Sequence, residues 1–219
     1  MENRSLFEDA TATYTQAMQI IDKMMPIVLY AFKDYSPETP KRQFDIILQS
    51  LLYDVALADK QLDSEELDFI RNIVKHNDII DAANSFLAGQ LDSELNWNII
   101  FIASLMNASE QLENFSNLFH AVIEEEIQDF VSKYAVVDAM SEDSGYGTAL
   151  FNCMAKIGAK LCIIDNDLQQ SEKDTVFEFL KPFIALWEVT KHEATVALEE
   201  DSSDDGENLE GTPFLGGKR

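Results

Sequence analysis

Basic residues are scarce in this chain of 219 residues, which has 16 Lys and Arg against 40 Asp and Glu. The formal net charge of −24 repels the phosphate backbone of nucleic acids, so direct nucleic-acid binding is not expected. Residues 199–219 hold seven acidic and two basic residues, which leaves 33 acidic and 14 basic ones in the rest of the chain. This charge favours cations and basic protein partners, and it also fits a surface that is simply well solvated.

Cysteines and long apolar runs are lacking as well. Cys153 and Cys162 are nine residues apart, on roughly opposite sides of a helix. We therefore predict core positions for both, without a disulfide or a thiolate metal site. The longest apolar stretches, at 24–32 and 99–106, are too short to span a bilayer, and the first ten residues lack the apolar region of a signal peptide. We expect no transmembrane segment and a cytoplasmic location.

Helix breakers are few, with five prolines and eight glycines, and apolar residues recur every three or four positions, as at Phe44, Ile47, Leu48 and Leu51. This pattern predicts an all-α fold, a compact multi-helix bundle. Pro26 is expected to kink the first helix. The expected helices cover residues 5–34, 41–58, 64–76, 78–90, 93–107, 110–139, 148–164 and 171–197.

The chain is expected to have three segments. Residues 1–40 form an N-terminal helix and a linker, and residues 41–198 form the main helical domain. Residues 199–219 form a disordered acidic tail, because their composition buries too little apolar surface to offset the entropy of ordering. The run Glu124-Glu125-Glu126 is expected to be a solvated helix face.

An acidic turn occurs twice, 106 residues apart. The segment DKQLDSEE at 59–66 superposes on DNDLQQSE at 165–172, with Asp, Leu and Glu shared at the first, fourth and eighth positions. Each copy has the pattern helix, acidic turn, helix, which predicts an internal helix-turn-helix duplication. The flanking apolar residues coincide in the pairs Leu48 and Met154, Leu51 and Ile157, Val55 and Leu161, Ile70 and Val176, and Val74 and Leu180.

The two turns are candidate metal sites. Calcium and magnesium prefer several oxygen ligands, and a short turn between helices supplies carboxylates together with free backbone carbonyls. Calcium is the divalent metal that we favour as the cofactor. The candidate ligands are Asp59, Asp63 and Glu66 in the first copy, and Asp165, Asp167 and Glu172 in the second.

Helix capping is the alternative explanation of the same carboxylates. Asp63 and Glu66 have the spacing of a capping box, which requires no metal. Capping does not account for Asp59 and Asp165, which close the preceding helices, where a negative charge is unfavourable. Both explanations stay open at the level of sequence.

The first turn also resembles a family signature. The segment LADKQLDSEEL at 57–67 is similar to the pattern Ala-Asp-Gly-x-Ile-Ser-x-Glu-Glu of the TerB-like, tellurite-resistance family, and the resemblance covers about residues 42–187. It implies a compact helical domain with internal duplication, metal-binding acidic clusters, and a role in tellurite resistance, phage defence or stress-response complexes near the membrane. By this resemblance, the metal-binding role falls to Asp59, Glu66, Asp165 and Glu172.

Motifs for catalysis are absent from the sequence. No histidine follows a glutamate by three positions, so the Glu-x-x-His pairs of helical di-iron proteins are missing. The chain also lacks a Gly-rich phosphate loop and a nucleophile elbow. We therefore expect no catalytic residues and no enzyme.

The function expected from the sequence is that of a TerB-like domain that binds divalent metal through its duplicated acidic turns. Such a domain would serve as a scaffold or sensor in a stress-response assembly. The alternative is an acidic protein-interaction module, such as an inhibitor, immunity or defence protein, that works without metal. Either way, we expect protein partners that are basic or membrane-associated.

Overall fold

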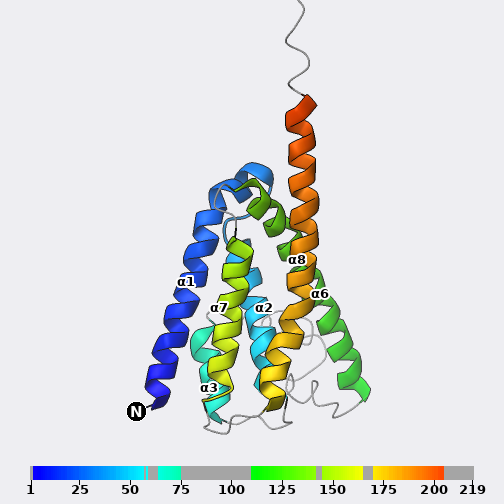
Figure 1. Cartoon of the computed structure of the whole chain (residues 1–219). Helices are drawn as coiled ribbons and strands as arrows, with labels where there is room; N and C mark the ends of the chain where they lie inside the picture. The colour runs from blue at the N-terminus through cyan, green and yellow to red at the C-terminus, as the bar shows by residue number, and fades with distance from the viewer. Residues whose placement is uncertain are drawn as a thin grey trace, which may run out of the picture.

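The described part of the chain folds into an all-α bundle (Figure 1). A computed structural model describes residues 2–56, 58, 64–74, 110–141, 145–164 and 170–204. Across these residues there are helices and connecting turns but no strand. The helices are α1 (Glu2–Ala31), α2 (Thr39–Ala56), α3 (Ser64–Ile73), α6 (Glu110–Met140), α7 (Tyr146–Leu161) and α8 (Gln170–Asp204).

The all-α fold predicted from apolar periodicity is confirmed. The predicted helices at 78–90 and 93–107 lie outside the described residues. α1 runs through Pro26 as one helix. α8 continues to Asp204, into the segment expected to form a disordered tail, because no helix breaker occurs between Pro182 and Gly206.

α2 lies at the centre of the bundle and contacts α1, α3, α6, α7 and α8. Of its 18 residues, 14 are buried, so this helix is enclosed on nearly all sides. Its apolar residues Phe44, Leu48, Leu51 and Leu52 are fully buried. The α2 helix therefore forms the axis around which the other helices are arranged.

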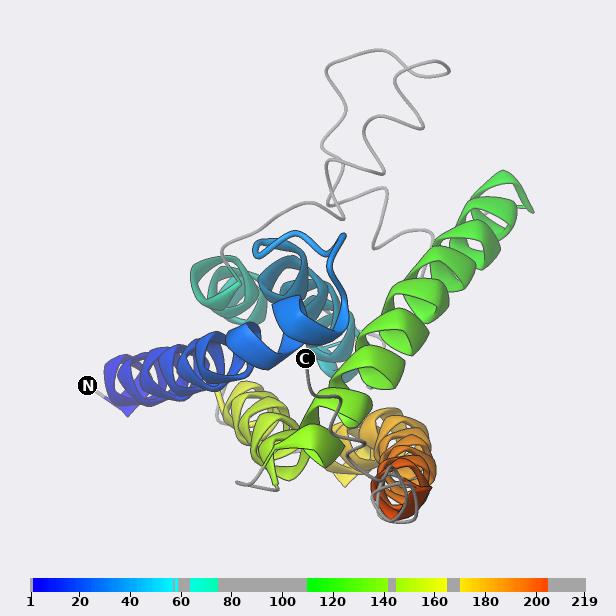
Figure 2. The same ribbon diagram turned by 90° about the horizontal axis from the view of Figure 1, so that it is seen from above.

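Helices from the two halves of the chain pack against one another. α1 packs against α7, and α2 packs against α6, while α6, α7 and α8 also contact each other. Figure 2, seen from above, shows α7 between α1 and α8. The Lys160 ammonium pairs with the Asp9 carboxylate at 2.9 Å across the α1–α7 contact.

The helix positions follow the 106-residue offset of the acidic turns. Adding 106 to the bounds of α2 gives 145–162, against Tyr146–Leu161 for α7. The same shift takes the start of α3 at Ser64 onto the start of α8 at Gln170. All five apolar pairs predicted from the repeat are buried on both sides, namely Leu48 and Met154, Leu51 and Ile157, Val55 and Leu161, Ile70 and Val176, and Val74 and Leu180.

The structure extends this correspondence to the first helix. Shifting α1 by 106 gives 108–137, which overlaps α6 (Glu110–Met140). Buried residues coincide there too, and α1 contributes to the same hydrophobic core as the helices of the 41–198 segment. The additional buried pairs are Ile21 and Ile127, Met24 and Phe130, and Val28 and Tyr134.

Candidate functional site

Two of the predicted metal ligands are buried glutamates at equivalent places. Glu66 lies in the first turn of α3 and is 5% exposed, and Glu172 lies in the first turn of α8 and is 3% exposed. Glutamate is rarely buried this deeply unless its charge is compensated. The positive end of the helix dipole supplies part of that compensation, and both side chains take part in further interactions.

The thiol of Cys162 is influenced electrostatically by both glutamates. Burial raises its pKa to about 12, and the negative charges of Glu172 and Glu66 add to the rise. Both carboxylates are therefore close enough to act electrostatically on one thiol at the end of α7. The Sγ atom donates a hydrogen bond to the Gly158 carbonyl at 3.2 Å. The starts of α3 and α8 thus both carry a buried glutamate that acts on this thiol.

The other predicted ligands, Asp59, Asp63, Asp165 and Asp167, lie outside the described residues. In the part of the chain that the structure describes, no three His, Cys, Asp or Glu side chains converge on a point where an ion could sit. Of the six predicted ligands, the structure describes Glu66, at the start of α3, and Glu172, at the start of α8. Carboxylates are hard oxygen donors that fit calcium or magnesium, whereas a protonated thiol such as that of Cys162 is a poor ligand for either ion.

Both cysteines occupy the core, as predicted, with Cys153 2% and Cys162 1% exposed and neither in a disulfide. Burial is the main cause of the raised pKa of each thiol. At pH 8 a thiol with a pKa near 12 has a thiolate fraction on the order of a thousandfold below that of an ordinary cysteine.

We therefore expect neither thiol to react with Ellman's reagent within minutes at pH 8, and both to react at once in urea. The control is the Cys153→Ser variant, which isolates Cys162. A fast reaction of the remaining thiol in the folded Cys153→Ser variant would show that the site around Cys162 is open to solvent.

Another buried acidic residue, Asp138, is absent from the residues predicted from the sequence. It is 1% exposed and lies near the end of α6. Its Oδ1 accepts hydrogen bonds from the backbone N–H groups of Gly145 and Tyr146, both at 3.0 Å. Its Oδ2 accepts hydrogen bonds from Trp187 Nε1 at 3.2 Å and Lys191 Nζ at 2.9 Å. One carboxylate therefore holds together the end of α6, the start of α7 and the middle of α8.

The protonation of Asp138 follows from these four donors. Burial alone would raise the pKa of its carboxyl, but the hydrogen bonds from Lys191, Gly145, Trp187 and Tyr146 outweigh that effect. The pKa is consequently below its ordinary value, and the carboxylate is charged at neutral pH. All four donors belong to the protein itself, so this site is a structural junction and not a place for a ligand.

A polar cluster joins α2 to α6 around Gln43, which is 1% exposed. Its Nε2 donates hydrogen bonds to Glu126 Oε2 and Asp129 Oδ2, both at 2.9 Å, and its Oε1 accepts one from the Tyr35 hydroxyl. Glu126 also pairs with Arg42 at 3.1 Å. The prediction of a solvated face at 124–126 is therefore wrong for Glu126, because an interhelical contact cannot be recognised from a local run of like charges.

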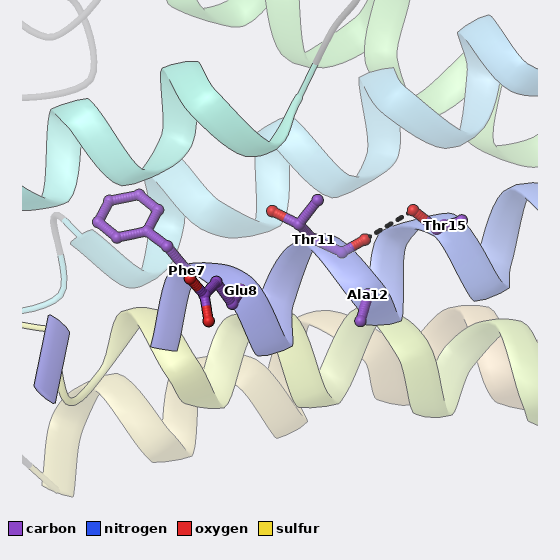
Figure 3. Close-up of a pocket in the computed structure, with 5 residues that line it drawn as sticks. All are labelled: Phe7, Glu8, Thr11, Ala12 and Thr15. Carbon is purple, nitrogen blue, oxygen red and sulfur yellow. Dashed lines mark hydrogen bonds between the residues drawn. The ribbon is translucent and has the colours of Figure 1, made fainter. Parts of the chain in front are cut away.

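A shallow depression of about 510 Å³ lies on the outer side of α1. Figure 3 shows that its five lining residues all come from this one helix, with the Phe7 ring directed toward α3. Of the lining side chains, only that of Glu8 ionises, and the Thr15 hydroxyl donates to the Thr11 carbonyl at 2.8 Å. Active sites gather polar groups from several elements, and this depression does not. The lining residues are Phe7, Glu8, Thr11, Ala12 and Thr15.

None of the helices in the described ranges is both long and apolar enough to cross a membrane. No protein-family model matches the chain, and no characterised protein and no solved structure shows significant similarity to it.

Proposed function

We propose that the chain is a non-enzymatic helical domain of the TerB-like type that binds a divalent metal ion, calcium first, through its two acidic turns. In this proposal it serves as a cytoplasmic scaffold or sensor in a stress-response assembly. The observation that carries the proposal is the pair Glu66 and Glu172. These residues are 106 positions apart, both are buried in the first turn of a helix, and both act on the Cys162 thiol.

The pair supports metal binding for a physical reason. A buried carboxylate is retained where hydrogen bonds, a basic group or a cation offsets its lost hydration. A divalent cation would offset the lost hydration of either carboxylate, while the adjoining turn supplies further oxygens. Asp59 and Asp63, with Asp165 and Asp167, are the ligands that the proposal adds from the turns.

The test is a calorimetric titration of calcium and magnesium into chelator-treated protein. We expect saturable binding by the wild type, and a melting temperature that rises with ion concentration because the ion binds only the folded state. The double variant Glu66→Gln/Glu172→Gln should lose both effects, since it keeps the size of the side chains and removes two charges. Glu188→Gln is the matched control, because this exposed glutamate lies on α8 about 24 Å from Glu172 along the helix.

A variant with Asp165→Asn and Glu172→Gln tests the second turn alone. If it keeps half of the binding stoichiometry, each turn is a separate site; if all binding is lost, the two turns form one site. Wild-type protein that neither binds ion up to millimolar concentration nor changes its melting temperature would contradict the metal proposal. Circular dichroism of each variant checks that the helices are retained.

The second candidate function is an acidic protein-interaction module that needs no metal. The net charge of −24 favours it, because such a surface attracts basic partners and speeds their association. The same titration separates the two functions, since this module would bind its partner equally well in the presence of a chelator.

A further inference from the structure

The second half of α8 has one side that no other described helix covers. α8 has 35 residues, about 50 Å of helix, against 16 residues in α7. Its C-terminal end extends past the ends of the other helices (Figure 1). Trp187 is buried, and none of the residues 188–200 that follow it on α8 is buried. The part of α8 that follows Trp187 extends beyond the core. It therefore has a face that no other described helix covers.

The free face has the spacing of a coiled-coil seam. Ala185, Val189, His192 and Val196 follow intervals of four, three and four residues, which places them in one row along the helix. All four are exposed, and Val189 is 56% and Val196 39% exposed. We call these four residues the α8 seam.

The seam points away from the bundle. In the same heptad register, Leu180 and Trp187 occupy the position opposite the seam, and both are buried in the core. Lys191 lies on that inner side as well, where it pairs with Asp138 at 2.9 Å. The helix therefore uses one side for the bundle and leaves the seam for another contact.

Acidic residues flank the seam. Glu188 and Glu193 occupy the two positions beside Val189 and His192 that interact across a pair of coiled helices. Both are exposed. A second copy of this chain would place glutamates opposite glutamates, which disfavours self-association, whereas a helix with Lys or Arg at those positions would form interhelical ion pairs.

We propose that the α8 seam docks a basic amphipathic helix of a partner protein, as a short two-helix coiled coil. The apolar row of the partner covers Val189 and Val196, and its basic residues face Glu188 and Glu193. This contact requires neither a metal ion nor the acidic turns, so it stands or falls independently of metal binding.

The probe is a labelled peptide of four heptads with Leu at the seam positions and Lys at the flanking positions, titrated with full-length protein in 150 mM salt and chelator. Fluorescence anisotropy should show saturable one-to-one binding. A peptide of the same composition with the Leu positions shuffled is the control for general attraction to an acidic protein, and it should not bind.

Variants locate the contact. Val189→Ser/Val196→Ser should weaken binding at least about tenfold, because the variant removes two apolar side chains that the partner helix would bury. Phe177→Ser, which changes an exposed residue outside the seam, should bind as the wild type does. Glu188→Lys/Glu193→Lys should lose the Lys peptide and accept a matching Glu peptide. All these residues are exposed, and circular dichroism checks the fold.

Three results would overturn the proposal. One is the absence of binding, and another is equal binding of the shuffled peptide or of the serine variant. The third is a wild-type dimer in sedimentation that the serine variant converts to a monomer, which would make a second copy the occupant of the seam.

Discussion

Replacing Asp138 by alanine is expected to lower the free energy of unfolding by about 3–5 kcal/mol, the range for removing one member of a buried charged pair. The variant leaves the Lys191 ammonium, the Trp187 indole N–H and the two N–H groups at the start of α7 without their acceptor. Urea denaturation followed by circular dichroism measures the loss. Glu124→Ala is the control, since removing this exposed carboxylate of the same helix should cost less. A loss below about 1 kcal/mol for Asp138→Ala would contradict the role of the junction.

Measurements at different pH values separate the contribution of the Asp138 charge to stability from the contribution of the side chain's shape. Because its pKa is lower in the folded than in the unfolded protein, its charge stabilises the fold above the unfolded value of about 4. That stabilisation is lost as the pH falls through the lower, folded pKa. The stability gap between the wild type and Asp138→Asn should therefore be constant from pH 7 to pH 5 and close at lower pH. A gap that stays undiminished as the pH falls below the unfolded pKa of about 4 would mean that shape alone sets the effect.

Replacing Gly147 by alanine is expected to destabilise the protein by about 2–3 kcal/mol, near the upper end for overpacking a core. An added Cβ would lie 2.1 Å from Trp187 Cε2 and 2.3 Å from Nε1. The indole cannot easily retreat, because it is hydrogen-bonded to Asp138 and packs edge-to-face on Phe151 with the ring centroids 5.4 Å apart. Thermal unfolding monitored by tryptophan fluorescence gives the measurement.

Gly158→Ala is the matched control, since its Cβ would be 3.1 Å from Val176 Cγ2, a contact that a small shift relieves. Replacing Trp187 by leucine should make room for a Cβ at Gly147. The two changes combined should therefore cost less than their sum. Additive losses would show that the indole is not what the new methyl group meets.

The fold was predictable because helix formation follows from local patterns. Apolar spacing around Leu48 and Leu51 predicted both the α2 helix and the burial of those residues. The start of α3 at Ser64 agrees with the predicted one. The extent of α8 was underestimated, because the loss of apolar periodicity after residue 198 does not end a helix that meets no breaker before Gly206.

The predicted site could be followed only in part. The repeat alone indicated that Glu66 and Glu172 occupy equivalent positions, and the structure finds both buried. Whether they bind metal stays a prediction. Asp138 could not be predicted, because its four donors lie between 7 and 53 positions further along the chain. Gln43 was missed for the same reason, since its carboxylate acceptors are 83 and 86 positions away.

The coincidence of buried positions in α1 and α6 could not be seen in the sequence. The buried residues correspond in position, but Met24 is paired with Phe130 and Val28 with Tyr134. Core positions tolerate such exchanges as long as volume and patterning are preserved. A comparison of residue identities therefore fails where a comparison of burial succeeds.

Helices of the two halves pack on one another, α1 on α7 and α2 on α6. These contacts between the halves determine how the chain reaches its native state. Each half leaves helix surfaces that the other half covers, so we expect residues 2–74 and 110–204 to unfold as one cooperative unit. Folding requires contacts between segments about 80 to 150 positions apart, as between Gln43 and Glu126 or Asp9 and Lys160, which slows the search for the native topology. If the chain is cut between the halves, we expect the two fragments to gain helicity when they are mixed. The midpoint of their unfolding transition should then depend on their concentration.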